Sequence, residues 1–270
     1  MKLITTTYGK PEYRARLIAK YLTLAGRTDI PIGLGPGNNS SAIEKMTPWI
    51  KDFPLTDYKG KIEQDGIQAI IEIINQSPNP LTVIEIGPMT TLAAAVRKDP
   101  GITTKANLVG MDGSIYKGYD GAPTPCPEYN VYCDVPDARL VFSAPWKSIT
   151  ITPLDTCGIV RVGGDLFQKL PMSMAPLVQG LLESTRIHNG LTNPAMLNNS
   201  GVCFDAVAVY LADPKNRGKF QKEKLKVKVE DNGATTISPR GAEMEVATGW
   251  QDKDGFLNEL VGLILGTIRN

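Results

Sequence analysis

The sequence predicts an α/β protein with an open, mainly parallel central sheet and helices on both faces. Short runs rich in Ile, Leu and Val at residues 81–86, 106–111 and 149–154 are typical of buried strands. Segments with apolar residues at helical spacing, such as 90–98 and the stretch around 138–142, lie between them. Strands separated by helices favour a parallel sheet, and such a sheet places its binding crevice at the carboxyl ends of its strands.

The N-terminal part predicts strand, helix and strand in that order. Residues 3–7 are rich in Ile and Thr and precede a glycine, as a short strand entering a loop does. Residues 11–25 carry apolar side chains at helical spacing, with Pro11 suited to a first turn and Gly26 to a C-terminal cap. Residues 30–35 form the next predicted strand.

The remaining elements follow from the same patterns. Helices are predicted at residues 65–75, 174–184, 205–212 and 256–268, and a β pair is predicted from the alternation in residues 225–230 and 243–247. No linker, internal repeat or low-complexity tract divides the 270 residues, of which 42% are hydrophobic. We therefore predict a single domain over residues 1–270.

Composition excludes several classes of partner. The 29 basic and 28 acidic side chains leave a formal charge of +1, which gives no reason to expect nucleic acid or a membrane surface as a partner. The N-terminus has no apolar stretch of signal-peptide length and no later stretch approaches a membrane span, so we expect a cytoplasmic protein. The four cysteines show no CxxC spacing and are expected to be free thiols.

Several segments, in order along nearly the whole chain, resemble the inosine-uridine-preferring nucleoside hydrolases. Residues 4–32, ending Leu24-Ala25-Gly26-Arg27-Thr28-Asp29-Ile30-Pro31-Ile32, resemble the family's second strand, helix and third strand. The segment Glu85-Ile86-Gly87-Pro88-Met89-Thr90-Thr91 is similar to its Gly-Pro-Leu-Thr-Asn turn.

Two later segments strengthen the resemblance. Pro127-Glu128-Tyr129-Asn130 is similar to the family's Ala-Glu-Phe-Asn, and Cys203-Phe204-Asp205-Ala206-Val207 to its His-Asp-Pro-Leu-Ala. The family's first strand and the loop after it, which carry an Asp-x-Asp-x-x-x-Asp-Asp motif, have no counterpart in this sequence. We therefore expect the chain to begin at the equivalent of the second strand.

The resemblance implies hydrolysis of the N-glycosidic bond of a ribonucleoside to base and ribose, within purine and pyrimidine salvage. It implies a calcium ion, with Asp205 and the backbone carbonyl of Thr90 as metal ligands. It assigns Glu128 and Asn130 to the ribose hydroxyls and places Phe204 beside the leaving base. It also implies a small-molecule nucleoside or ribose as the partner, and a homo-oligomer.

Some positions depart from the family pattern. Phe204 stands where a leaving-group histidine or tyrosine is common, Lys10 where an asparagine is usual, and Ala122 where a ribose-binding asparagine is found. Two retained calcium ligands are fewer than the six to eight oxygens that calcium takes. The catalytic residues, and whether the chain is an active enzyme, are therefore left open.

Structural roles compete with these functional ones. Asp205 is also a candidate cap for a helix that begins at Ala206. Glu128 and Asn130 alternate as the exposed residues of one strand face do. The sole histidine, His188, is expected at the surface, and the glycines of residues 33–37 do not complete a dinucleotide-binding loop.

Two other functions remain open. The chain could be a pseudoenzyme that binds a ribosyl ligand or a partner protein without hydrolysing it, since the acidic loop and three site residues differ together. It could also be an assembly protein whose open sheet accepts a strand from another chain, because unpaired strand edges invite pairing.

Overall fold

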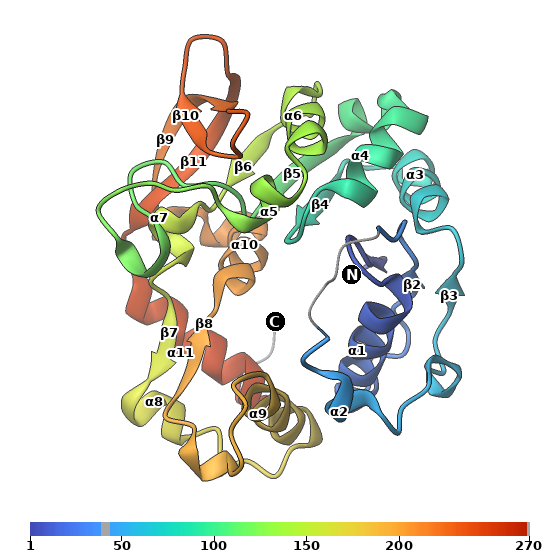
Figure 1. Ribbon diagram of the computed structural model, residues 1–270, viewed down its shortest axis with the longest axis vertical. Coiled ribbons are helices and arrows are strands. Elements are labelled where there is room, and N and C mark those ends of the chain that lie inside the picture. The colour runs from blue at the N-terminus through green and yellow to red at the C-terminus, as the bar shows by residue number, and fades with distance from the viewer. Residues whose placement is uncertain (39–43, 269–270) are drawn as a thin grey trace. The chain divides into compact units, whose positions relative to one another are not determined.

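The computed structural model describes residues 1–38 and 44–268 (Figure 1). Contacts divide the chain into two compact units. Unit 1 comprises residues 1–66, 161–201 and 254–270, and unit 2 comprises residues 67–160 and 202–253. Strands joined by helices form both units, which confirms the predicted α/β class.

Unit 2 contains a six-stranded sheet in the order β10-β9-β11-β6-β5-β4. Strands β4, β5, β6 and β11 run parallel to one another, whereas β9 is antiparallel to both β10 and β11. The predicted β pair is confirmed, with Leu225 opposite Met244. The bounds are β4 Leu81–Glu85, β5 Ala106–Gly110, β6 Ile149–Ile151, β9 Phe220–Val229, β10 Thr235–Ile237 and β11 Ala242–Trp250.

Helices connect these strands and pack against them. Helix α10 contacts β4 and β5, and helices α4 and α6 pack together. The helices are α3 Gly66–Gln76, α4 Thr90–Lys98, α5 Tyr129–Cys133, α6 Val135–Ser143, α7 Leu154–Cys157 and α10 Phe204–Ala212, with a 3₁₀ turn, η3, at Tyr119–Gly121.

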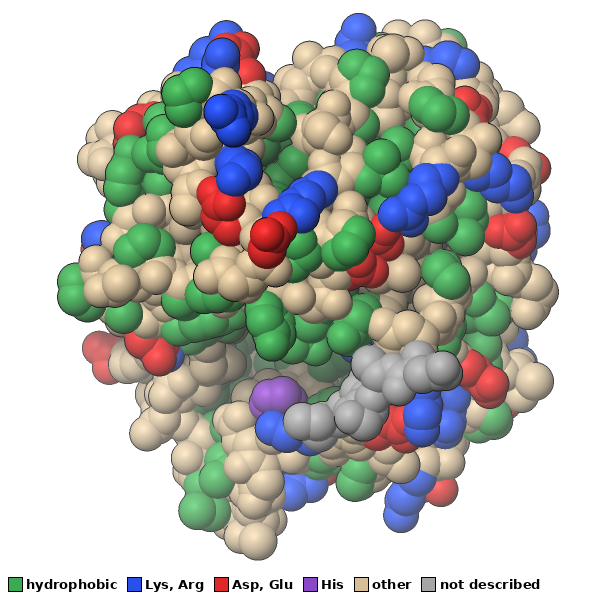
Figure 2. All heavy atoms as spheres, turned by 45° about the horizontal axis from the view of Figure 1, so that its top comes forward, with side chains coloured by type: hydrophobic (Ala, Val, Ile, Leu, Met, Phe, Trp, Pro, Cys, Tyr) green, Lys and Arg blue, Asp and Glu red, His purple; other side chains and the backbone are tan. Residues whose placement is uncertain are grey.

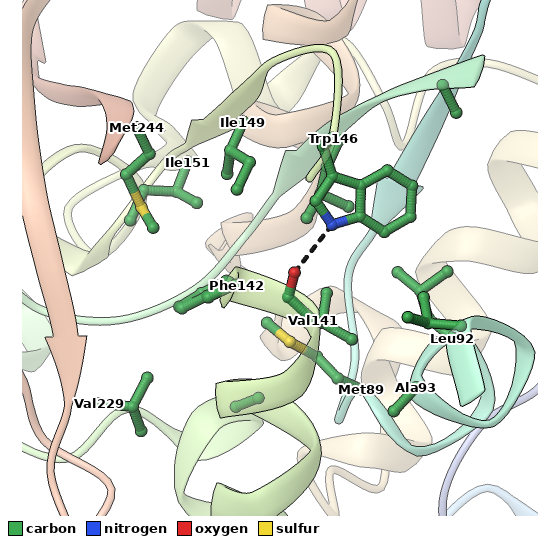
Figure 3. Close-up of a cluster of buried hydrophobic side chains, with 14 of the residues drawn as sticks. Met89, Leu92, Ala93, Val141, Phe142, Trp146, Ile149, Ile151, Val229 and Met244 are labelled. Atoms are coloured by element: carbon green, nitrogen blue, oxygen red, sulfur yellow. Dashed lines mark hydrogen bonds between the residues drawn. The ribbon is translucent and has the colours of Figure 1, made fainter. Parts of the chain in front are cut away.

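The core of unit 2 lies between this sheet and its helices (Figure 3). Met89 and Leu92, at the start of α4, lie in the same cluster as Ile151 of β6 and Met244 of β11. Trp146 is buried, and its indole N–H donates to the carbonyl oxygen of Val141 over 2.8 Å, so its one polar group is satisfied. This packing fixes the strand ends that carry the candidate site.

Unit 1 has a three-stranded parallel sheet in the order β1-β2-β3 and a two-stranded sheet of β7 and β8. A Cβ at Gly33 would lie 2.9 Å from the Cα of Gly66, so this close backbone approach requires glycine. The bounds are β1 Ile4–Thr5, α1 Pro11–Leu24, β2 Ile32–Gly33, α2 Thr47–Ile50, β3 Ile62–Glu63, β7 Arg161–Gly163, α8 Gly164–Gln168, α9 Pro176–His188, β8 Asn199–Val202 and α11 Lys253–Leu265.

On the face shown in Figure 2, basic and acidic side chains are interspersed, in keeping with the formal charge of +1. Across residues 1–38 and 44–268, no helix has the length and apolar character needed to cross a membrane.

Candidate active site

The candidate site lies in unit 2 at the carboxyl ends of β4 and β5. Glu85 is the last residue of β4 and pairs in register with Gly110, the last residue of β5. The amide of Met111 then donates to the carbonyl oxygen of Glu85 over 2.9 Å, which holds the two strand ends together. Parallel strands end at the same edge of a sheet, so the loops that follow them meet there.

Glu128 lies at the N-terminus of α5, and its side chain is buried, with 2% of its surface exposed. Its Oε1 accepts from the amide of Asn130 over 2.9 Å, and its Oε2 accepts from Gly113 over 3.2 Å and from Val131 over 3.3 Å. The reading of Glu128 and Asn130 as one face of a strand is therefore wrong, because a carboxylate at this position satisfies the free amides of a helix start.

Burial raises the pKa of Glu128 to about 7, although the three amide hydrogen bonds favour the charged form and lower it. A carboxylate has about four lone-pair sites, so three amides leave it one further acceptor position. Glu128 is thus both a structural cap and a candidate acceptor for a ligand hydroxyl.

Asn130 is fixed by the loop that follows β5. Its Nδ2 donates to the carbonyl oxygen of Met111 over 2.9 Å, and the side chain is buried to 6% exposure. The loop of Met111, Asp112 and Gly113 therefore contacts both Glu128 and Asn130. The two residues predicted to bind the ribose are therefore brought together by one segment.

Asp205 lies in the first turn of α10, which begins at Phe204 with Cys203 as its N-cap residue. The alternative that Asp205 caps a helix starting at Ala206 is therefore wrong, because the helix has already begun. Asp205 keeps surface exposure, yet surrounding protein atoms withdraw enough water from its carboxyl to raise the pKa to about 6. Asp205 is consequently available to a ligand.

Phe204 forms an aromatic contact beside Asp205. Its ring meets that of Tyr119, in the η3 turn, edge to face at a centroid distance of 6.0 Å. The hydroxyl of Tyr119 accepts from the amide of Tyr129 over 2.9 Å, and burial raises its pKa to about 12. The aromatic pair is therefore tied to the start of α5.

Other predicted positions have clear places. Thr90 begins α4, and its hydroxyl donates to Asp134 over 3.2 Å, leaving its backbone carbonyl in the first helical turn. Ala122 follows the η3 turn and is exposed. Lys10 lies in unit 1, where it forms an ion pair with Glu44, and His188 is exposed at the end of α9.

Sequence reasoning missed Glu85 and Asp112 as site residues. Glu85 is 6% exposed and Asp112 fully buried. Glu85 Oε2 and both carboxyl oxygens of Asp112 have no satisfied hydrogen bond within the part of the chain that the structure describes. The two carboxyls influence each other's pKa as hydrogen-bonded side chains do. Two carboxyl groups can form a hydrogen bond only when one of them carries a proton. The available signal was a charged residue closing each of two apolar strand segments.

Burial is the main cause of the altered acidity of this pair. It raises the pKa of Glu85 to about 8 and that of Asp112 well above its ordinary value, and their mutual repulsion adds to the effect on Asp112. Glu128 and Asp205 contribute further negative charge. The candidate site thus contains four carboxyls whose charged forms are all disfavoured.

The donor set does not by itself fit calcium. Asp205 and the carbonyl of Thr90 supply two oxygens, whereas calcium takes six to eight. Among residues 1–38 and 44–268, no three His, Cys, Asp or Glu side chains are arranged to hold a metal ion. The residues described here therefore account for only part of a calcium site.

An open, mainly parallel sheet with polar side chains gathered at its strand ends is the arrangement in which α/β proteins commonly bind their ligands. The chain belongs to the inosine-uridine preferring nucleoside hydrolase family, whose sequence profile matches residues 1–258. The resemblance drawn from the motifs is thus confirmed.

Individual relatives agree with the family. The chain is 26% identical over 224 residues to a probable uridine nucleosidase 2 of Arabidopsis thaliana, covering 78% of this chain and 66% of that protein. It is 30% identical over 166 residues to the inosine-uridine preferring nucleoside hydrolase of Leishmania major, covering 56% and 51%. The chain thus spans about half to two thirds of the length of these relatives.

Solved structures show the same fold. A purine-preferring ribonucleoside hydrolase from Gardnerella vaginalis superimposes with a TM-score of 0.77 at 22% identity, covering 98% of this chain and 90% of that one. A plant nucleoside hydrolase gives a TM-score of 0.73 at 17% identity, covering 98% of both chains.

Proposed function

We propose that this protein hydrolyses the N-glycosidic bond of a ribonucleoside, giving free base and ribose. The observation that carries the proposal is the loop Met111–Gly113, which holds Glu128 and Asn130 together at the strand ends. Both match family residues that contact ribose hydroxyls. Family membership supports the reaction class.

The side chains have distinct roles in this proposal. Glu128 accepts a hydrogen bond from a ribose hydroxyl through the lone pair that its three amide donors leave free. Asn130 accepts another through its Oδ1, because its Nδ2 is engaged by Met111. These contacts orient the sugar before its bond to the base breaks.

Asp205 is the proposed general base. Cleavage of the bond builds positive charge on the sugar and needs a water molecule that loses a proton. A carboxyl with a pKa of about 6 is ionised near neutrality and still basic enough to accept that proton. The negative charge of nearby carboxylates also favours the cation-like transition state.

Calcium enters only as an expectation from the family. When bound, it would supply Lewis-acid and orienting chemistry, and Asp205 with the Thr90 carbonyl would be among its ligands. Because these two oxygens do not complete a calcium site, the roles proposed here rest on the side chains alone.

Ligand binding without hydrolysis is the second candidate, and Phe204 favours it. Phenylalanine cannot donate a proton to a departing base, whereas the histidine or tyrosine common at this family position can. The aromatic contact with Tyr119 would still offer an apolar wall to a base.

Release of free base separates the two functions. Inosine and uridine are incubated with the protein, with and without added calcium, and the base is quantified by chromatography. We expect release that falls at least tenfold in Asp205→Asn and persists in Glu72→Gln, an exposed acid on α3. Nucleoside binding with no release under any condition would instead establish the pseudoenzyme.

A further inference from the structure

We propose that Glu85 and Asp112 are positioning residues: they share a proton, and the resulting hydrogen bond holds the loop Met111–Gly113 in the arrangement that presents Glu128 and Asn130. That Glu128 and Asn130 bind a ligand rests on the proposed function. The restraint of the loop Met111–Gly113 by the Glu85–Asp112 hydrogen bond does not depend on it.

The pair is enclosed on all sides by protein. Asp112 is fully buried and Glu85 nearly so, and three of their four carboxyl oxygens have no satisfied partner within the described residues. Only Glu85 Oε1 is satisfied, accepting from the amide of Gly87 over 2.9 Å. A proton donated from one carboxyl to the other gives each residue a partner, and no other donor among the described residues bonds to these three oxygens.

The position of Asp112 depends on a glycine. A Cβ built at Gly110 would lie only 2.0 Å from Asp112 Oδ2, so the carboxyl occupies the space that any side chain at residue 110 would fill. The lack of a side chain at residue 110 lets the carboxyl of Asp112 lie back over the end of β5, where Gly110 pairs with Glu85 of β4.

The same segment fixes the ligand-facing residues. The carbonyl of Met111 accepts from Asn130, and the amide of Gly113 donates to Glu128, so the neighbours of Asp112 on either side each contact one of them. A movement of Asp112 therefore moves both contacts.

Among the described residues whose charges act on the pair, none is a cation that could replace the proton. The titratable groups that face the pair are Glu128 at the start of α5, Asp205 on α10 and the buried thiol of Cys157 on α7, all of which are neutral or negative. Release of the shared proton to water leaves two adjacent buried carboxylates, which repel each other and drive Asp112 outward. The loop then loses its restraint.

Amide hydrogen exchange by NMR tests the restraint without a ligand. Protection factors are measured from pH 6 to pH 9.5 for the amides of Gly113, Asn130 and Val131, with Leu108 inside β5 as the internal reference. We expect the three site amides of the wild type to lose at least tenfold protection relative to Leu108 as pH rises.

Glu85→Gln is the decisive variant, because its amide donates to Asp112 at every pH. It should retain protection at the three site amides up to pH 9.5, whereas Glu72→Gln should behave as the wild type. Wild-type protection that stays constant with pH, or a Glu85→Gln variant that loses protection in parallel, would overturn the proposal. Asp112→Asn supplies a second variant that keeps the hydrogen bond should Glu85→Gln fold poorly.

Inosine affinity, measured by calorimetry at pH 6.5 and pH 9, links the restraint to the site. The wild type should bind at least tenfold more weakly at pH 9, and Glu85→Gln should show no such difference. Absence of binding at both pH values would count against the proposed function, while the exchange data would still decide the positioning role.

Discussion

Asn130 donates through its Nδ2 to the carbonyl oxygen of Met111 over 2.9 Å, which ties the start of helix α5 to the loop leaving β5. Glu128, at the N-cap position of the same helix, accepts from Gly113 two residues further along that loop. Glu128 and Asn130, the residues assigned to ribose, therefore also connect helix α5 to the loop after β5. We expect substitutions there to affect both stability and ligand binding, and the two effects can be measured separately.

Glu128→Ala should lower the free energy of unfolding by about 1–2 kcal/mol, because it removes a helix cap and leaves three amides unsatisfied. Urea unfolding followed by circular dichroism gives the value. Glu128→Gln retains an acceptor oxygen and should lose clearly less. Equal stability of Glu128→Ala and wild type would show that the cap hydrogen bonds are not formed in solution.

Stability should fall as pH rises from about 5 to 8. Burial raises the pKa of Glu85 from 4.5 to about 8, so the native state holds this proton more tightly than the unfolded chain does. Unfolding then releases protons, and the free energy of unfolding decreases by up to about 1.4 kcal/mol per pH unit for one such group. Above the folded pKa the dependence from Glu85 levels off.

Titration of Glu128 and Asp205 changes stability with the same sign, so the wild type alone does not show the contribution of Glu85. Comparison with Glu85→Gln isolates that contribution. The variant should show a shallower decline in urea-derived stability over the same pH range. A decline as steep as that of the wild type would mean that Glu85 is already ionised in the folded protein.

Gly110→Ala should destabilise unit 2 by about 1–3 kcal/mol, because the added methyl group would meet the buried carboxyl of Asp112. Gly218→Ala is the matched control, since a Cβ at that position meets no atom within 4 Å. Thermal unfolding of the two variants measures the difference. Similar midpoints would contradict the close approach of Asp112 to Gly110.

Phe204→His should accelerate base release if hydrolysis is limited by protonation of the leaving base. A positioned general acid contributes on the order of 10²–10⁴-fold. Initial rates with inosine measure the gain, and Phe204→Leu provides the apolar comparison. Equal rates in both variants would show that the base leaves without help from this position.

The sequence was sufficient to predict the regular elements. Helix α4 spans the predicted residues 90–98, and the β pair of residues 225–230 and 243–247 lies in β9 and β11. Strands β3, β7, β8 and β10 were missed because runs of two to four residues carry too little periodicity. A single domain over residues 1–270, a cytoplasmic location and a homo-oligomer remain predictions.

The candidate site was only partly predictable. The family motif identified Glu128 and Asn130 but not their place at a helix start, since alternation over three residues cannot distinguish a strand from a helix cap. Glu85 and Asp112 were missed because no motif relates them. Their proximity arises from the register of β4 and β5, which a single sequence does not specify.

Calorimetric titration of inosine into the wild type, Glu128→Gln and Glu72→Gln at pH 6.5 tests most directly whether this site binds a ribosyl ligand. We expect the wild type and Glu72→Gln to bind inosine with the same affinity, and Glu128→Gln to bind it at least tenfold more weakly. Equal affinity for all three proteins would contradict this expectation, because the ligand would then be held away from the start of α5.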